Sequence, residues 1–141
     1  MTFVVVRSLT PQQVDDLMDL YRCTYWAKDR DVKAVERMLS SSEYLFGAVE
    51  QGTGRLCGFA RVVSDHVYRA FVLDVVVHPE FRGRGLTRLI FGSILEHPEL
   101  KDMECLLLFC KDDVVKLYQR FGFDAYEDMY LMRRTTGSQT E

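Results

Sequence analysis

Residues 74–95 read DVVVHPEFRGRGLTRLIFGSIL, and this stretch decides how the rest of the chain is organised. The β-branched residues 75–77 predict a strand, which ends at His78 and Pro79. Two arginine–glycine pairs follow at residues 82–85, and apolar residues then recur at helical spacing. The order is therefore a strand, a basic turn that contains glycine, and a helix.

The basic turn has the chemistry of an anion site. The first backbone N–H groups of a helix have no intrahelical partner and lie at the positive end of the helix dipole. Gly83 and Gly85 lack a Cβ, so the backbone can approach an anion closely. Arg82, Arg84 and Arg88 add positive charge around it. We expect this turn to bind a phosphate or diphosphate group.

The length and composition indicate one small domain. The 141 residues are enough for a single core, so we assign residues 1–134 to one domain and residues 135–141 to a flexible tail. A formal net charge of −3 gives no reason to expect nucleic acid or a membrane surface as a partner. The sequence has neither an apolar signal segment nor a run long enough to span a membrane, which predicts a cytoplasmic protein.

The four cysteines show no spacing that is typical of a metal site. They form neither a CxxC pair nor a Cys/His ligand pattern, so no metal is expected. Reduced cysteine behaves as a small apolar residue. We therefore expect all four side chains to be buried thiols.

The segments before the basic turn predict a strand, two helices and a three-stranded meander. Thr10, Pro11 and Gln13 form a capping-box pattern at the start of the first helix. A polar break at residues 28–31 precedes the second helix, which ends at the serines 40–42. The strands predicted here are residues 3–7, 44–50, 56–64 and 70–78.

The segments after the turn predict a closing part of the sheet. The apolar residues 105–110 indicate a central strand that is buried on both faces. Asp112 or Asp113 can cap the next helix, and Gly122 can stop it. Residues 123–126 and 129–133 predict two last strands.

The placement of the turn excludes two common nucleotide-binding folds. A dinucleotide-binding unit places its glycine turn after an early parallel strand, whereas here a meander precedes the turn. The G-K-[ST] ending of a phosphate-binding P-loop is also missing.

Two motifs resemble the GCN5-related N-acetyltransferase (GNAT) superfamily. The family motif [Gln/Arg]xxGx[Gly/Ala] corresponds to Arg82, Gly83, Arg84, Gly85, Leu86 and Thr87, of which Thr87 departs from the usual small residue. The second motif is a tyrosine four residues before a Gly-Phe pair, and here it is Tyr118 in LYQRFGF. The resemblance covers residues 3–133. It implies an α/β (α+β) GNAT fold: a mixed, mostly antiparallel sheet of six to seven strands, splayed between the fourth and fifth, with about four helices.

The resemblance also implies a cofactor and its site. Acetyl-CoA is the co-substrate of the family, and its pantetheine arm pairs with the backbone of the fourth strand. The matching residues here are Val75, Val76 and Val77, and the diphosphate would lie on the turn from Arg82 to Thr87. The backbone N–H of Val75 or Val76 is the natural donor to the oxyanion of the transition state.

Tyr118 matches the general acid of the family, which protonates the departing thiolate. Without the motif, it reads as one more core aromatic residue on an apolar helix face. Two candidates stay open for the general base. Asp74 directly precedes the cofactor strand's valines, where structural pairing is the alternative to a role as base or amine-binding group. Asp65, on the loop that leads into that strand, is the second candidate.

The acceptor is the least defined part of the prediction. Tyr25 and Trp26 lie between the first two helices and are candidates for an acceptor pocket, or they simply cap the core. The small size and acidic charge favour a small-molecule amine, with a protein lysine or N-terminus as the alternative. A non-catalytic acyl-CoA sensor is the alternative from another class. The resemblance also suggests a homodimer through the terminal segment 130–133 or a sheet edge.

Overall fold

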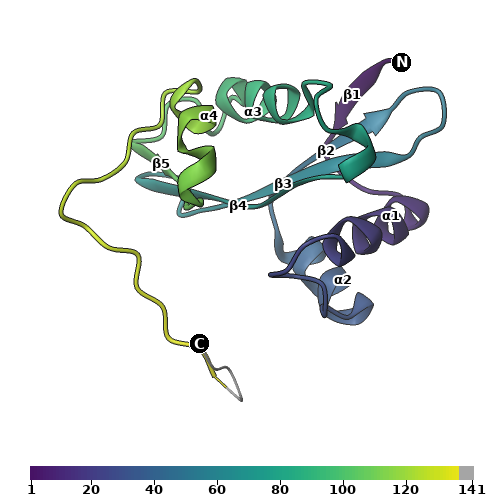
Figure 1. The fold of residues 1–141 in the computed structure, drawn as a ribbon, viewed down its shortest axis with the longest axis horizontal. Coiled ribbons are helices and arrows are strands. Elements are labelled where there is room, and N and C mark those ends of the chain that lie inside the picture. The colour runs from purple at the N-terminus through teal and green to yellow at the C-terminus, as the bar shows by residue number, and fades with distance from the viewer. Residues whose placement is uncertain (137–141) are drawn as a thin grey trace. The chain divides into compact units, whose positions relative to one another are not determined.

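Five strands form one sheet in the first part of the chain. The computed structural model describes residues 1–136 and divides the chain into two compact units, the first of which is Met1–Leu108. The sheet has the order β1-β2-β3-β4-β5 (Figure 1). Its strands are β1 (Phe3–Val6), β2 (Tyr44–Glu50), β3 (Leu56–Ser64), β4 (Arg69–Val77) and β5 (Cys105–Leu107).

The first four strands pair antiparallel, and β2, β3 and β4 form the predicted three-stranded meander. The hairpin of β2 and β3 has the predicted bounds, and β4 is shifted by one residue from its predicted range. Only β4 and β5 pair in parallel, with Arg69 opposite Cys105 and Phe71 opposite Leu107. The pairing with β5 ends at Phe71, whereas the pairing of β4 with β3 continues to Val77. β4 therefore continues beyond Phe71 without pairing to β5, which ends at Leu107.

Helices cover both faces of this sheet. Helices α1 (Pro11–Arg22) and α2 (Val32–Ser41) lie on one face, and α3 (Leu86–Glu96) lies on the other (Figure 1). The predicted capping box is formed, since the Thr10 hydroxyl accepts from the backbone of Gln13 and the Gln13 side chain accepts from the backbone of Thr10. The carboxylate of Asp31 caps α2 by accepting from the N–H of Ala34 at 2.8 Å.

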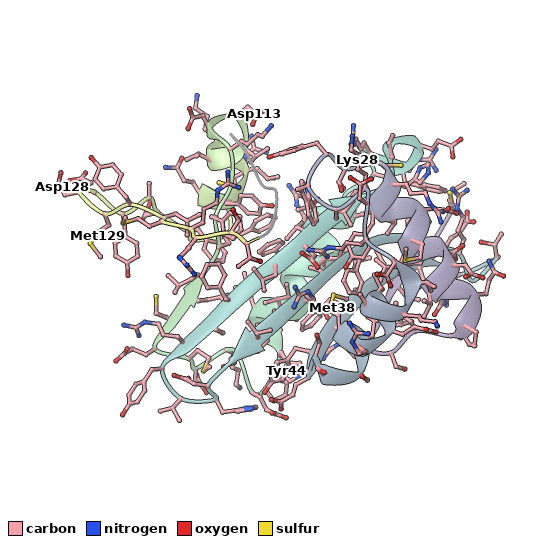
Figure 2. All side chains as sticks on the ribbon, turned by 90° about the horizontal axis from the view of Figure 1, so that it is seen from below. Lys28, Met38, Tyr44, Asp113, Asp128 and Met129 are labelled. Atoms are coloured by element: carbon pink, nitrogen blue, oxygen red, sulfur yellow. The ribbon has the colours of Figure 1, made fainter. Side chains whose placement is uncertain are left out.

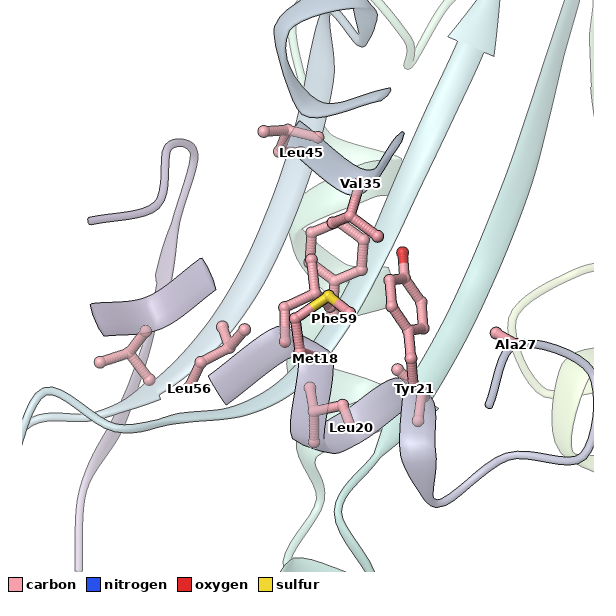
Figure 3. Close-up of a cluster of buried hydrophobic side chains, with 11 residues drawn as sticks. Met18, Leu20, Tyr21, Ala27, Val35, Leu45, Leu56 and Phe59 are labelled. Carbon is pink, nitrogen blue, oxygen red and sulfur yellow. The ribbon is translucent and has the colours of Figure 1, made fainter. Parts of the chain in front are cut away.

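The core between the helix pair and the sheet is apolar and closely packed. Met18 and Tyr21 of α1 and Val35 of α2 meet Phe59 of β3 (Figure 3). Met38 of α2, labelled in Figure 2, packs against the same cluster. The buried ring of Tyr21 lies edge-on to Phe59, with 6.5 Å between the ring centroids. Its hydroxyl reaches past these apolar groups toward β4, where the polar part of the site begins.

The second unit begins at Phe109 and contains two short helical segments. A 3-10 turn, η2 (Asp112–Val114), leads into α4 (Val115–Gln119). No side-chain hydrogen bond caps either segment, so the predicted cap by Asp112 or Asp113 is wrong. Gly122 ends the segment as predicted, with φ +91° and its N–H donating to the carbonyl of Gln119.

The prediction of six to seven strands is wrong for the described residues. Residues 123–126 and 129–133 are not strands, and β5 spans three residues instead of the predicted six. Short apolar and aromatic stretches occur at both ranges, but such composition does not ensure a partner for the backbone groups of a strand. The predicted tail, residues 135–141, has no regular structure at 135–136, and residues 137–141 lie outside the described part.

The cysteines differ from the prediction in their exposure. Cys57 is buried and Cys105 is half-buried, but Cys23 and Cys110 are exposed. Cys23 follows directly after the last residue of α1, where the chain leaves the core. The prediction that all four thiols are buried is therefore wrong.

Candidate functional site

A β-bulge interrupts β4 at Asp74. Phe59 of β3 pairs with Val76, whereas Arg61 pairs with Leu73, so Asp74 and Val75 together oppose the single residue between them. Asp74 has a φ of +57°, in the left-handed region that an aspartate seldom occupies inside a strand. Such a backbone conformation persists only when its surroundings hold it.

Side chains from three elements hold the Asp74 carboxylate. Oδ2 accepts from Arg30 Nη1 and from Arg61 Nε, each at 2.8 Å, and from the Tyr21 hydroxyl at 3.0 Å. The Asp74 side chain is 7% exposed, whereas that of Arg30 is 33% exposed. The bulge is thus tied to α1, to the segment between α1 and α2, and to β3.

The two arginines keep the carboxylate ionised. Burial alone would raise the pKa of Asp74, but the hydrogen bonds and charges of Arg30 and Arg61 outweigh it and leave the pKa below its usual value. Burial, followed by the neighbouring charge of Asp74, raises the pKa of Tyr21, so the phenol stays protonated. These contacts favour structural pairing over the role of a general base for Asp74.

The glycine turn follows β4 and opens α3. Gly83 and Gly85 both have a φ of +77°, and Gly85 is the N-cap of α3 without a side-chain cap. A Cβ built on either glycine would meet nothing within 4 Å. The turn therefore needs glycine for its backbone conformation, and the space beside it is open. The first N–H groups of α3, including those of Leu86 and Thr87, lack intrahelical acceptors.

Arginines surround this turn as the sequence suggests. Arg82, Arg84 and Arg88 are exposed. The guanidinium of Arg84 lies 5.2 Å from the ring centroid of Phe81, which holds the side chain beside the turn. The chemistry of the turn, with backbone donors and cations, fits a diphosphate.

The other half of the family signature lies in the second unit. Tyr118 of α4 is half-buried, and its ring lies edge-on to Phe123 at 6.3 Å. Burial, with a smaller contribution from Cys110, raises the pKa of Tyr118 to about 12. The phenol thus retains its proton at neutral pH, as a proton donor must.

Asp65 organises its own turn. Its Oδ1 accepts from the backbone N–H groups of Val67, Tyr68 and Arg69 at 2.8–3.0 Å. These bonds lower the pKa of the Asp65 carboxyl. The geometry fits a carboxylate that closes the connection between β3 and β4 rather than one that takes up a proton.

The aromatic pair between α1 and α2 lies at the surface, where the Trp26 ring packs edge-on against the buried ring of Tyr21 at 6.2 Å between centroids. Trp26 is 41% exposed and Tyr25 is 70% exposed. The guanidinium of Arg30 lies 5.6 Å from the Trp26 ring centroid and 4.8 Å from that of Tyr21. Lys28 lies on the same segment (Figure 2). The structure therefore brings Trp26 close to the Asp74 cluster through Arg30.

Sequence reasoning missed the partners of Asp74. Arg30 was predicted only as part of the polar break between the first two helices, with no role in a site. Arg61 was not predicted to be a site residue. One signal was present: Arg61 is the only charged residue in the nine-residue β3. A charged side chain inside an apolar strand needs a partner, and Asp74 is the only charged residue inside β4 after its first position.

Comparison with known proteins agrees with this architecture. The model of the acetyltransferase (GNAT) family matches residues 14–123. The chain belongs to the GNAT family. Its match includes both the glycine turn and Tyr118, so the two motifs lie within the shared region.

Relatives of known sequence or structure extend the comparison. The chain is 32% identical over 100 residues to "Uncharacterized N-acetyltransferase ycf52" of Pyropia yezoensis, covering 70% of this chain and 57% of that protein. The chain thus spans little more than half the length of that relative. A crystal structure from Xanthomonas campestris pv. campestris, described as a GNAT-family acetyltransferase, has a TM-score of 0.79 and 32% identity, covering 96% of this chain and 94% of that one.

A more distant structure shares the fold alone. It is AAC(6')-Iy in complex with a CoA-linked bisubstrate analogue, with a TM-score of 0.72 and 17% identity, covering 96% of this chain and all of that one.

Two further observations concern residues 1–136. No helix there is both long and apolar enough to cross a membrane, and no group of three or more His, Cys, Asp or Glu could hold a metal ion.

Proposed function

We propose that this GNAT protein is an acetyl-CoA-dependent N-acetyltransferase that acts on a primary amine, with both substrates bound at once. The observation that carries the proposal is a bulged β4, whose pairing with β5 ends at Phe71. After a 3-10 turn, η1 (Pro79–Phe81), it leads to an open glycine turn at the start of α3. This arrangement offers main-chain groups for an extended arm and backbone donors for a diphosphate.

Each part of acetyl-CoA has a proposed partner. The backbone of Val75, Val76 and Val77 holds the pantetheine arm, and the turn from Arg82 to Thr87 holds the diphosphate. The N–H of Val75 or Val76 donates to the thioester oxygen as negative charge develops on it.

The reaction joins the amine nitrogen to the acetyl carbon and breaks the carbon–sulfur bond. The amine loses one proton, and the departing thiolate gains one from the Tyr118 hydroxyl. The contacts of Asp74 and Asp65 support structural roles for both, so we assign no side chain as general base. A cationic acceptor loses a proton to solvent and attacks as the free amine. The proton that the nitrogen releases as the amide forms passes through water to the Tyr118 phenolate and restores the phenol.

We propose a small-molecule amine as the acceptor, with Tyr25 and Trp26 beside it. The formal net charge of −3 fits a small cationic compound. The test is release of free thiol from acetyl-CoA with a panel of polyamines, aralkylamines, amino acids and basic peptides. Turnover of the small amines supports the proposal, and preference for the peptides would point to a protein acceptor. Acetyl-CoA binding without turnover across the panel would instead indicate a sensor.

A further inference from the structure

The buried ion cluster at the β4 bulge joins two regions that the proposed function uses separately. Asp74 belongs to the strand proposed for the cofactor. Arg30 belongs to the segment between α1 and α2, which carries Trp26. Their hydrogen bond of 2.8 Å therefore connects the proposed cofactor strand to the proposed acceptor wall.

The cluster accounts for the unusual backbone of Asp74. A left-handed residue in the middle of a strand is strained unless a side-chain interaction compensates. Arg61 reaches the carboxylate from the neighbouring strand, and Tyr21 reaches it from α1. Since three donors converge on one oxygen, the side chain holds the bulge in place.

The segment that carries Trp26 has apolar anchors besides Arg30, because Ala27 is buried in the core cluster and the Trp26 ring lies edge-on to Tyr21 at 6.2 Å between centroids. The Thr24 hydroxyl donates to the carbonyl of Tyr21 and accepts from the N–H of Ala27, and both bonds lie within the segment or at its start. Arg30 adds a charged link from the segment to Asp74 of the sheet, and it also lies over the rings of Tyr21 and Trp26. Loss of its guanidinium would remove the charged link and the contact over the Trp26 ring, while Ala27 would stay in the core, so Trp26 should become more mobile.

We infer that Asp74 and Arg30 are positioning residues, whose ion pair fixes the Trp26 segment beside the β4 bulge and thereby places the acceptor amine against the acetyl group. The inference rests on the proposed function for the identity of the two substrates. The anchoring of Trp26 can be measured without either of them.

The experiment uses the fluorescence of Trp26, the only tryptophan of the chain. We compare Arg30→Met, which keeps the apolar stem, with Arg30→Lys, which keeps the charge. The control is Arg22→Met, because the ion pair of Arg22 with Asp19 is exposed on α1. The readouts are acrylamide quenching of Trp26 and hydrogen exchange of residues 24–31, with circular dichroism to verify folding.

The expected result is faster quenching and exchange in Arg30→Met, partial recovery in Arg30→Lys, and wild-type behaviour in Arg22→Met. With an amine that the panel identifies, Arg30→Met should raise the acceptor KM by about tenfold. Its CoA Kd, measured by calorimetry, should stay within about twofold of wild type. An unchanged acceptor KM, or a CoA Kd that rises as much as the acceptor KM, would overturn the positioning role.

Unchanged quenching and exchange in folded Arg30→Met would overturn the inference. Failure of the proposed function has a different signature. In that case, the unaltered protein would neither bind acetyl-CoA nor turn over any amine, while Trp26 would still respond to Arg30→Met and support the anchor.

Discussion

Replacement of Gly85 by alanine isolates the backbone conformation of the glycine turn. A Cβ on Gly85 would meet nothing within 4 Å, and the same holds for Gly52 in the turn between β2 and β3. The two positions differ because Gly85 has a φ of +77°, whereas the φ of Gly52 lies outside the left-handed region. A change in stability at Gly85 alone therefore reports strain rather than crowding.

The magnitude follows from these two facts. A left-handed alanine costs about 1–2 kcal/mol, and the stiffer unfolded chain returns about 0.4–1 kcal/mol. We expect Gly85→Ala to lower the free energy of unfolding by about 1 kcal/mol, or Tm by about 4 °C for a chain of this length. Gly52→Ala should raise Tm slightly, since only the effect on the unfolded chain applies.

Thermal unfolding of both variants by circular dichroism measures the difference, and calorimetry measures CoA binding. The added methyl group of Gly85→Ala should also weaken CoA binding by about tenfold, because it occupies the open space beside the proposed diphosphate site. Equal Tm values for the two variants would refute the strain argument. Undiminished CoA affinity in Gly85→Ala would refute the placement of the diphosphate.

Three further predictions concern single side chains. Tyr118→Phe should slow acetyl transfer with little change in CoA affinity. Because the pKa of Tyr118 is raised to about 12, the phenol stays protonated at pH 10, and the kcat of the wild-type protein should not fall there through loss of this proton. The pKa of Asp65 is lower in the folded protein than in the unfolded chain. The ionised carboxylate therefore stabilises the fold at any pH above the pKa of an unfolded aspartate, and this stabilisation is lost as the pH falls through the pKa of the folded state. Asp65→Asn should therefore lower Tm at neutral pH and leave it nearly unchanged in acid, which melting curves across pH will check. Burial raises the pKa of the Cys57 thiol, so Cys57 should resist a thiol reagent in the native protein and react on unfolding, whereas early labelling of Cys57 by mass spectrometry would contradict its burial.

Local sequence signals were sufficient for much of the fold. The capping box at Thr10 and the hairpin of β2 and β3 depend on residues close in the chain, and the structure agrees with both. The two strands predicted after Gly122 had no such local determinant. A strand requires a partner at a matching register, and the short apolar stretches there do not provide one.

The site also divides into features set by neighbouring residues, which the sequence predicts, and features set by distant residues, which it does not. The glycine turn was recognised from adjacent residues, Arg82 to Gly85, whose chemistry acts locally. The cluster at Asp74 joins residues as far apart as Tyr21 and Asp74, which are 53 positions apart. No periodicity links them. Asp74 could therefore be predicted from the sequence as a buried carboxylate, but its partners could not be predicted. The bulge itself arises from the pairing of β4 with β3, which a single strand's pattern does not encode.

The short parallel pairing of β5 has a consequence for the order of folding. The antiparallel strands β2, β3 and β4 follow one another through tight connections, so they meet at a small entropic cost. Arg69 and Cys105 are separated by 36 positions and by the whole of α3. Only three residue pairs between β4 and β5 offset the entropy that is lost when this long loop closes. The meander should therefore form early and β5 should dock late, which makes the β5 edge of β4 the last part of the sheet to be completed.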